Sequence, residues 1–315
     1  SVSIAPAMYV VARLTTDEGN GRVRATRFRY GDLRADLARG AALGFRWKDT
    51  RDEKTGVRTR TEFVQSPLLS GSILSERSWL PVQGADRLLS ELSNEWMLVP
   101  SGNKYYWRRL INTATRSLDP NGDVLVSELT EFGGFDEFGN IGRIRSIRDD
   151  GSGSITDNTY SSDPSEAALG RLLSARVRRF LDAGSEAGSC MAPSCEQRRA
   201  SFSYDPQTLL LIEEIANADS PRYATRTRYV RDPFGNVVEK VVRALAGGVP
   251  ERRETFRFVD GRGRLLLSTE SGVIRSENVY ESALANALGV PSKIIDGNMQ
   301  SHAKRIDAFG RVIEE

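Results

Sequence analysis

The chain has 315 residues, of which 39% are hydrophobic and 27% are charged, and its formal net charge is +2. This balance is typical of a folded protein. It excludes an intrinsically disordered chain and a strongly basic one that would bind nucleic acid or acidic membranes through its overall charge. No apolar run approaches the roughly 18 to 20 residues that a membrane-spanning helix requires.

Strand-like segments separated by turn residues fill most of the chain. Residues 8–66 alternate such segments with three expected turns, at 17–21, 31–32 and 52–56. Further strands are expected at 72–80 and around 96–111, where β-branched and aromatic residues alternate with polar ones. We therefore predict an all-β fold, built as an extended, mainly antiparallel sheet of at least a dozen strands.

Helix is predicted in only two short pieces. The first lies near 163–172, where Ser162 can cap the start of a helical turn. The second lies near 281–289 and ends at Gly289, which is followed closely by Pro291.

One short phrase recurs along the chain. An Asp follows a strand end, a hydrophobic residue and a Gly come after a spacer, and a β-branched or aliphatic run completes the phrase. Clear copies occupy 136–141, 232–237 and 307–312, and looser copies begin at Asp119, Asp205 and Asp260. The steps from Asp205 to Asp232 and from Asp232 to Asp260 are 27 and 28 residues, which fits one hairpin per repeat.

The chemistry of the phrase predicts a hairpin corner. An Asp carboxylate can accept backbone N–H groups two residues ahead, and Gly adopts the positive φ that such turns require. The residues expected to form these structural repeat turns are Asp136, Gly139, Asp205, Asp232, Gly235, Asp260, Gly263, Asp307 and Gly310. Asp-rich turns can also bind calcium, but each phrase offers one Asp with few further carboxylates, which favours a structural role.

Repeats of this kind bury a face only by stacking on their neighbours. We therefore expect one continuous segment over 1–315, with the clearest repeat units at 119–315. Because the twist of many strands accumulates, the sheet is expected to be curved rather than flat.

Nearly all basic residues are arginines. Runs such as 24–30 and 222–229 place Arg beside Thr and aromatic residues along expected strands. A nucleic-acid surface would need such a stripe without nearby acids. Acidic residues are interspersed instead, which favours cross-strand Arg–carboxylate pairs and a chain without a nucleic-acid partner.

Candidates for catalysis or metal binding are scarce. His302 is the only histidine, which excludes Ser-His-Asp, Cys-His and multi-histidine sites. Neighbouring acids such as Glu213 and Glu214 point to opposite faces of a strand, so they do not form a facing acid–base pair. We expect no enzyme activity, no cofactor and no metal site. Cys190 and Cys195 lie in a loop of small residues, where a local disulfide and two free thiols are both open.

Several blocks of the chain match the pattern of one family. The matching segments are 30–34, 39–45, 52–56, 63–67 with Gly71, and 160–163 with 169–172. On these blocks the chain resembles the YD-repeat, or rearrangement-hotspot (RHS), proteins of bacteria. Within them it looks most like the shell region of the B subunit of insecticidal toxin complexes and the related Salmonella plasmid-virulence B protein. The block from Arg39 to Phe45 is the most specific of the matches.

The resemblance implies a fold and a role. Members of the family wrap a spiralling β-sheet into a hollow cocoon that houses a toxic C-terminal polypeptide before delivery. The implied partners are the remaining shell segments, a companion toxin subunit and the enclosed polypeptide, and the implied location is that of a secreted toxin component. We expect the chain to be a piece of a longer protein. The alternative is an extracellular adhesion or carbohydrate-binding β-module, which a groove of exposed Trp and Tyr would favour.

Overall fold

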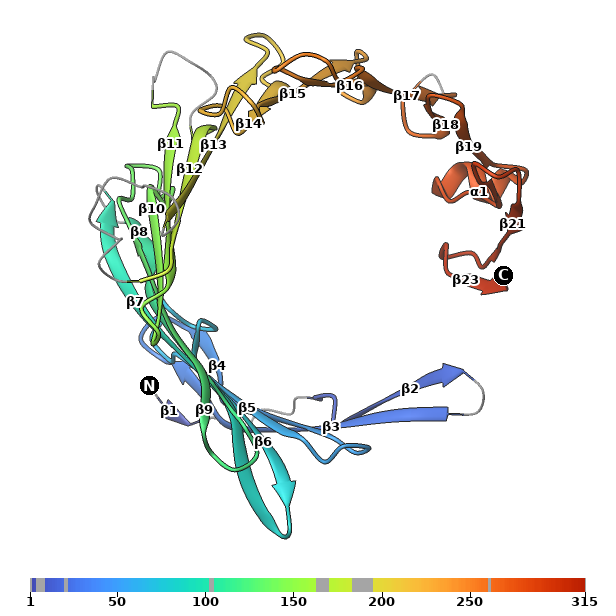
Figure 1. Ribbon diagram of the computed structural model, residues 1–315. Coiled ribbons are helices and arrows are strands. Elements are labelled where there is room, and N and C mark those ends of the chain that lie inside the picture. The colour runs from blue at the N-terminus through green and yellow to red at the C-terminus, as the bar shows by residue number, and fades with distance from the viewer. Residues whose placement is uncertain are drawn as a thin grey trace. The chain divides into compact units, whose positions relative to one another are not determined.

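The computed structural model describes residues 2–3, 9–19, 22–101, 105–162, 170–182, 195–259 and 262–314. Within these residues the chain forms 23 β-strands and one α-helix (Figure 1). The described strand pairings are antiparallel throughout, which confirms the predicted all-β class. The chain divides into two compact units, residues 1–157 with 177–197 and residues 158–176 with 198–315.

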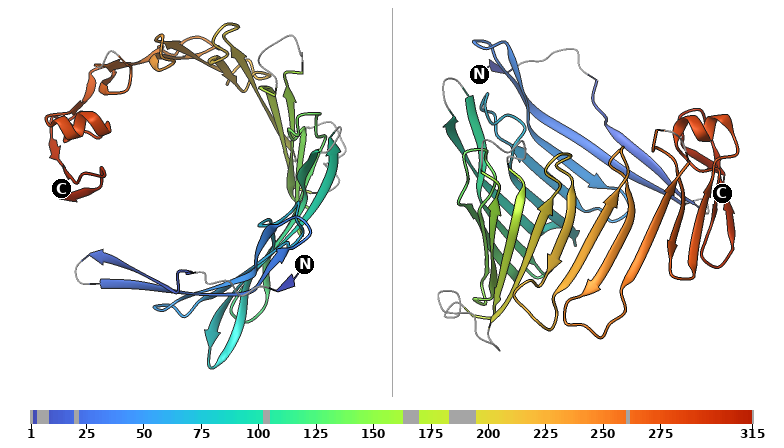
Figure 2. Two further views of the ribbon diagram at one scale, coloured as in Figure 1. Left: turned by 180° about the vertical axis from the view of Figure 1, so that it is seen from behind. Right: turned by 90° about the horizontal axis from the view of Figure 1, so that it is seen from above.

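The first unit is built mainly from long strands. Its strands are β1 (Val2–Ser3), β2 (Arg13–Gly19), β3 (Arg22–Asp36), β4 (Ala41–Asp52), β5 (Arg58–Phe63), β6 (Ile73–Val82), β7 (Ala85–Ser101), β8 (Tyr105–Leu118), β9 (Val124–Gly133), β10 (Arg143–Arg148) and most of β11 (Gly153–Tyr160). From β3 to β11 each strand pairs with the next one in the sequence, and β1 and β2 both pair with β3. From β3 to β11 the strands therefore follow chain order (Figure 2).

The second unit has shorter strands and contains the helix. Its elements are β14 (Leu211–Ala216), β15 (Thr225–Arg231), β16 (Val237–Ala244), β17 (Arg252–Phe258), β18 (Leu266–Ser271), β19 (Ile274–Val279), α1 (Ala283–Leu288), β20 (Lys293–Ile295), β21 (Ser301–Ala303), β22 (Arg305–Ile306) and β23 (Val312–Glu314). Two strands, β12 (Leu172–Phe180) and β13 (Cys195–Tyr204), contribute residues to both units. From β13 to β21 neighbours in sequence pair, and β22 pairs with β23 in a hairpin of its own.

The helix has the boundaries that the sequence predicts. The side chain of Ser282 accepts a hydrogen bond from the backbone N–H of Ala285 and caps the first turn. Gly289 ends the helix at a φ of 69°, a left-handed conformation that glycine adopts without strain. Leu265 lies beside this end of the helix, 3.8 Å from the position that a Cβ on Gly289 would take.

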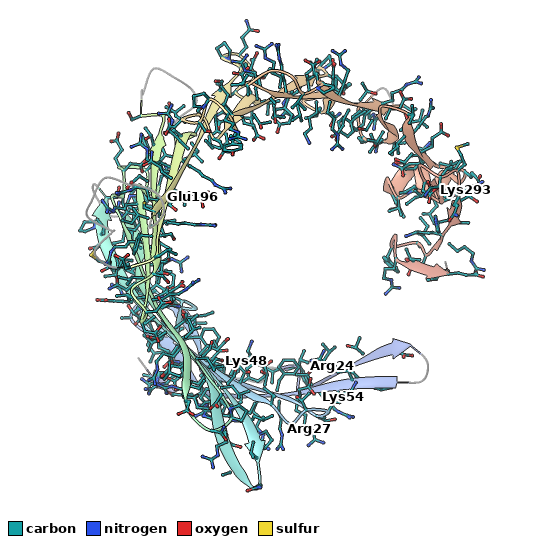
Figure 3. All side chains as sticks on the ribbon, viewed as in Figure 1. Arg24, Arg27, Lys48, Lys54, Glu196 and Lys293 are labelled. Carbon is teal, nitrogen blue, oxygen red and sulfur yellow. The ribbon has the colours of Figure 1, made fainter. Side chains whose placement is uncertain are left out.

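Among the residues that the structure describes, few apolar side chains are buried in either unit. Those of the first unit are Ala25, Leu43, Ile155 and Phe180, and those of the second are Ala224, Leu265 and Ala285. The main sheet in each unit is a single layer, and side chains project from both of its faces (Figure 3). Most apolar side chains are therefore half-buried between neighbours on the same sheet face rather than enclosed between two layers.

The turn that the sequence predicts at 31–32 is wrong, because β3 continues through these residues. A Cβ at Gly31 would collide with the indole ring of Trp47, which lies directly opposite on β4. The glycine therefore makes room for an aromatic side chain within the sheet rather than reversing the chain. Asp32 follows at a φ of 55°, a local irregularity that does not interrupt the pairing of β3 with β4.

Some expectations fall outside the described residues. These are Asp260, Cys190 and residues 163–169 of the first expected helix. Where that helix was expected to end, Gly170 lies in a turn and β12 begins at Leu172. Cys195 begins β13 and is disulfide-bonded. A bond between Cys195 and Cys190 stays a prediction, which peptide mapping without reduction would test.

Candidate functional site: the Asp corners

The three clear copies of the repeated phrase fold into the same corner. In the copy at 232–237, the carboxylate Oδ1 of Asp232 accepts the backbone N–H groups of Phe234 and Asn236, each at 2.9 Å. The backbone closes the corner twice, from the N–H of Asp232 to the carbonyl of Asn236 and from the N–H of Gly235 to the carbonyl of Asp232, both at 3.0 Å. The same set of bonds recurs around Asp136 and Asp307.

The second carboxylate oxygen is also used. Asn236 donates its side-chain N–H to Oδ2 of Asp232 at 3.0 Å, and Asn140 does the same to Asp136 at 2.8 Å. At the third corner, the side chain of Arg311 takes this place and donates to Oδ2 of Asp307 at 2.6 Å. The polar residue after the glycine therefore completes the hydrogen bonding of the aspartate.

The glycines of these corners have the positive φ that the sequence predicts. The φ values of Gly139, Gly235 and Gly310 are 86°, 89° and 79°. Gly263 of a looser copy has a φ of 66°, and a Cβ there would lie 2.6 Å from the side-chain nitrogen of Asn236. Conformation and close packing both favour glycine at that position.

Two corners are one residue longer than the others. At Asp205, the carboxylate accepts the N–H groups of Gln207 and Thr208, and the N–H of Asp205 bonds to the carbonyl of Leu210. At Asp52, the corner ends at Val57 with the same arrangement. The loose copy at Asp205 thus has the chemistry of the phrase in a wider loop.

One corner was missed by the sequence reasoning. Asp296 accepts the backbone N–H groups of Asn298 and Gln300 at 2.9 and 2.8 Å, which is the bonding of the clear copies. Met299 occupies the position of the glycine, with a φ of 65°. The signal that could have identified this corner is an Asp after two isoleucines with a polar residue four positions later, and not the glycine.

Hydrogen bonds within the corners lower the pKa of the aspartates. For Asp52, the backbone N–H of Thr55 is the largest cause and the Arg24 side chain is the next, and the pKa falls from 3.8 to about 2. At Asp136 and Asp232 burial opposes this effect, but hydrogen bonds from the asparagine side chain and the backbone outweigh it and lower the pKa. Backbone N–H groups also lower the pKa of Asp119, Asp205 and Asp307.

Neighbouring corners of the second unit contact one another. The side chain of Asn236 donates to the carbonyl of Gly263 at 2.6 Å and so joins the corner at 232–237 to the next one. Arg231, just before this corner, donates to the carbonyl of Gly235 within it and to the carbonyl of Leu211, which follows the corner at Asp205. These bonds connect corners that are 27 to 28 residues apart in sequence, as stacked repeats require.

The corner carboxylates offer little to a metal ion, because backbone N–H groups occupy them. Among the residues that the structure describes, no group of three or more His, Cys, Asp or Glu side chains could hold a metal. His302 is exposed, and its Nε2 lies 4.0 Å from Oδ2 of Asp296. The hydrogen bonds of the corner carboxylates fix the backbone turns.

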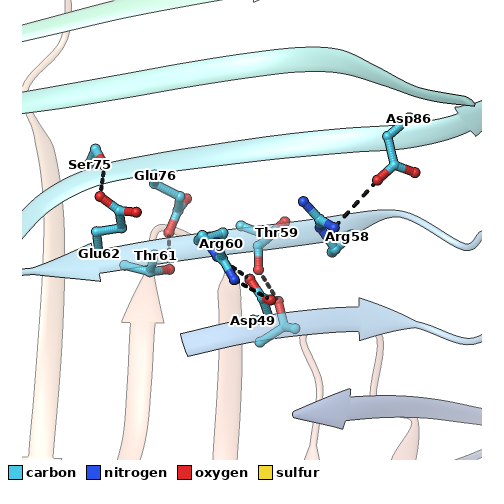
Figure 4. Close-up of polar contacts among 10 residues, drawn as sticks. Asp49, Arg58, Thr59, Arg60, Thr61, Glu62, Ser75, Glu76 and Asp86 are labelled. Atoms are coloured by element: carbon cyan, nitrogen blue, oxygen red, sulfur yellow. Dashed lines mark hydrogen bonds and ion pairs between the residues drawn. The ribbon is translucent and has the colours of Figure 1, made fainter. Parts of the chain in front are cut away.

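Cross-strand ion pairs cover the sheet faces between the corners. Arg60 binds Asp49 with two hydrogen bonds of 2.8 and 3.0 Å (Figure 4). Arg77 pairs with Glu91 at 2.7 Å, and Arg228 pairs with Glu213 at 2.9 Å. These contacts confirm the cross-strand Arg–carboxylate pairs that the sequence predicts. Exposed pairs such as Arg77 with Glu91 contribute little each to stability, whereas the part-buried Arg60–Asp49 pair has the two-bond geometry of a stronger contact.

In the part of the chain that the structure describes, no helix is long and apolar enough to cross a membrane. No family model and no curated protein matches the chain. Solved structures do match its fold. The chain is similar to part of the crystal structure of TcdB2-TccC3-Cdc42 over 94% of its length, with a TM-score of 0.60 and 11% identity.

Two further structures give similar matches. They are the crystal structure of TcdB2-TccC3, with 94% of this chain covered, a TM-score of 0.58 and 11% identity, and the Photorhabdus luminescens Tc holotoxin pore, with 92%, 0.55 and 12%. The three matches cover 21% or 22% of the other chains, so this chain spans about a fifth of their length. The chain thus has the fold of a segment of these toxin-complex chains, in agreement with the resemblance found in its sequence.

Proposed function

We propose that the chain is a wall segment of a YD/RHS-type toxin shell, secreted by a bacterium, that encloses a toxic polypeptide for delivery, and that it acts without catalysis. The fold shared with the toxin-complex chains supports the proposal, as do the sequence blocks that resemble the family. Since the chain spans about a fifth of those chains, further wall segments would come from its parent protein or from a companion subunit.

The observation that carries the proposal is the single-layer construction of each unit. A self-contained binding module usually buries its core between two layers of secondary structure. Here only seven hydrophobic residues among those described are buried. A single layer leaves two accessible faces, one for solvent and one for an enclosed chain, and the stacked corners extend it strand by strand. Such a sheet suits a wall better than a compact module.

Protection from protease tests the proposal. The longest gene product that contains this chain would be expressed, and the survival of its C-terminal polypeptide during limited proteolysis would be measured. We expect the polypeptide to survive in the wild type and to be cut sooner in Gly235→Val, which strains a corner of the wall. Arg243→Gln, on an exposed sheet position, is the matched control that should leave protection unchanged. Rapid digestion in the wild type would contradict the shell.

The absence of catalysis is tested on the purified chain. We expect no turnover of glycans, esters, peptides or nucleotides. Turnover that a single Asp or Glu substitution abolishes would assign the chain to an enzyme class instead.

One observation favours the alternative of carbohydrate binding. Tyr105 and Trp107 lie two residues apart on β8, so they share a face, and they are 78% and 40% exposed. Exposed aromatic rings supply the stacking area that sugars bind. A glycan array with the wild-type chain and with Tyr105→Ala would test this role. Binding that the substitution removes would support the module, and an array without signal would leave the shell as the proposal.

A further inference from the structure

Four arginines lie directly opposite one another on four neighbouring strands of the first unit. Arg13 of β2 pairs with Arg27 of β3, Arg27 with Arg51 of β4, and Arg51 with Arg58 of β5. Residues directly opposite in an antiparallel pair point to the same face of the sheet. Figure 3 places Arg24 and Arg27 on opposite sides of β3, so these four arginines, here called the arginine row, occupy one face only.

The positive charges of the row are not balanced. Glu53 lies 2.7 Å from Arg13 and also pairs with Arg27, and Asp86 lies 3.4 Å from Arg58 (Figure 4). Arg51 is exposed and has no ion pair with any residue that the structure describes. Like charges directly opposite each other destabilise a sheet. The repulsion is therefore uncompensated at Arg51, which lies between Arg27 and Arg58, and a bound anion would relieve it.

A groove lies beside three arginines of the row, on β3, β4 and β5. It has a volume of about 180 Å³ and is lined by Arg27, Arg29, Asp49, Thr50, Arg51 and Arg58. Arg29 is exposed and has no ion pair among the described residues, whereas Asp49 is already bound by Arg60. Arg29 and Arg51 thus bring guanidinium groups without an ion-pair partner among the described residues to the groove, and such groups bind carboxylates or phosphates with two hydrogen bonds.

The spacing of the row fits an extended peptide. Neighbouring strands lie about 4.8 Å apart, so the four arginines span about 14 Å across the sheet. Alternate side chains of an extended peptide repeat about every 6.7 Å, so three of them span about 13 Å. Three carboxylates at every second residue would therefore cover the length of the row from one side of the peptide, with one near each end and one between Arg27 and Arg51.

The aromatic residues beside the groove argue against a nucleic acid. The guanidinium of Arg58 lies 4.4 Å from the ring centre of Trp79, and that of Arg60 lies 4.5 Å from the ring of Trp47. These arginines already occupy ring faces on which bases would stack. Single-stranded nucleic acids bind largely through such stacking, whereas an acidic peptide needs only the guanidinium groups.

We propose that the arginine row binds an extended acidic peptide segment that lies across strands β2 to β5 and carries a carboxylate at every second residue. The interaction goes beyond the proposed shell function and does not depend on it, because all four arginines lie within this chain and need no other shell segment.

Fluorescence anisotropy with a labelled peptide of alternating Glu and Ser, about ten residues long, tests the proposal on the full 315-residue chain. We expect binding at low salt that weakens as salt is added. Arg51→Gln should weaken it about tenfold, the effect of losing one charge-assisted contact. The urea midpoint of this variant should not fall, because Arg51 faces Arg27 and Arg58 in the free protein and its removal relieves their mutual repulsion.

Arg108→Gln is the matched control, since Arg108 is exposed on β8, has no ion pair among the described residues and lies outside the row. It should leave the affinity unchanged. Equal weakening by the two variants, or no binding to the wild type at low salt, would overturn the proposal. Equal binding of a peptide with all its Glu residues at one end would contradict the proposed requirement for a carboxylate at every second residue. Tighter binding of a single-stranded oligonucleotide would make the row a nucleic-acid surface.

Discussion

The two units make antiparallel sheet in different ways. In the first unit, β3, β7 and β8 have 15, 17 and 14 residues. The turn between β6 and β7 consists of Gln83 and Gly84 at φ values of 51° and 84°, as in the tight hairpins that match strand twist. In the second unit, strands β14 to β19 have only six to eight residues.

The difference shows what a corner contributes. Long strands supply many backbone hydrogen bonds and cross-strand contacts for each turn, so the conformation of any one turn matters less. Short strands supply fewer, so the side-chain bonds of the corners, which both units have, form a larger share of the contacts in the second unit. Asn236 even joins one corner to the next. We therefore expect the second unit to depend more on its corners, and the first on its strands.

The largest expected effect concerns the buried leucines, where the units should behave alike. Leu43 of the first unit and Leu265 of the second are 1% and 2% exposed. Either Leu→Ala substitution should cost about 2–4 kcal/mol, because it removes buried methyl groups and leaves a cavity. Urea denaturation, with hydrogen exchange to identify the unit affected, would measure it. A loss below about 1 kcal/mol at one site would mean that its unit lacks a fixed core there.

A glycine pair measures the corners directly. Gly235→Val should cost about 2 kcal/mol, because the position has positive φ and a Cβ would lie 3.0 Å from Leu210. Gly84→Val in the first unit should cost about 1 kcal/mol, because φ is positive but no atom lies within 4 Å of the added Cβ. Equal losses in urea denaturation would remove the distinction between the two kinds of turn.

At the Asp296 corner, where Met299 takes the place of glycine, a substitution to glycine should increase stability. Met299→Gly should raise the stability by about 0.5–1 kcal/mol, because relief of the left-handed strain exceeds the added entropy of the unfolded chain. Phe309→Gly, in the next corner at a position without this strain, should give no gain. Thermal unfolding of both variants would compare them, and a less stable Met299→Gly would show that the methionine side chain contributes packing.

The smallest expected effect is a dependence on acid. The folded pKa of Asp52 is about 2 and its ordinary value is 3.8, so its ionised form stabilises the fold above pH 3.8. That contribution is lost as the pH falls from 3.8 through about 2. Asp52→Asn should lose less stability than the wild type over this interval, as urea midpoints at each pH would show. Parallel curves for the two proteins would contradict the role of this carboxylate.

The corners could be predicted from sequence because their chemistry is local. Asp232, Gly235 and Asn236 lie within five residues, and together they favour one turn. Asp296 was missed because the reasoning depended on glycine, whereas the bonds come from the carboxylate. Gly31 was misread because its reason lies on another strand, in the ring of Trp47.

The arginine row could not have been found in this way. Arg13 and Arg51 are brought into line by the registers of β2 with β3 and of β3 with β4. Register depends on turn lengths and bulges, such as the shift between Arg34 and Ala35, and a slip of one residue would send a side chain to the other face. Sequence predicts that arginines lie on strands, but not which of them meet.

Leu209 and Met299 both hold the left-handed position that glycine fills elsewhere, with φ values of 62° and 65°. During evolution, the glycine of the phrase can therefore be replaced more readily than the aspartate. The carboxylate bonds of the corners at Asp205 and Asp296 form without glycine at this position, so the turn can persist when the glycine is absent. Repeats in such chains should therefore keep their turn structure after their sequence pattern can no longer be recognised. Sequence searches based on the aspartate and its hydrogen-bonding partners should find copies that glycine-based patterns miss.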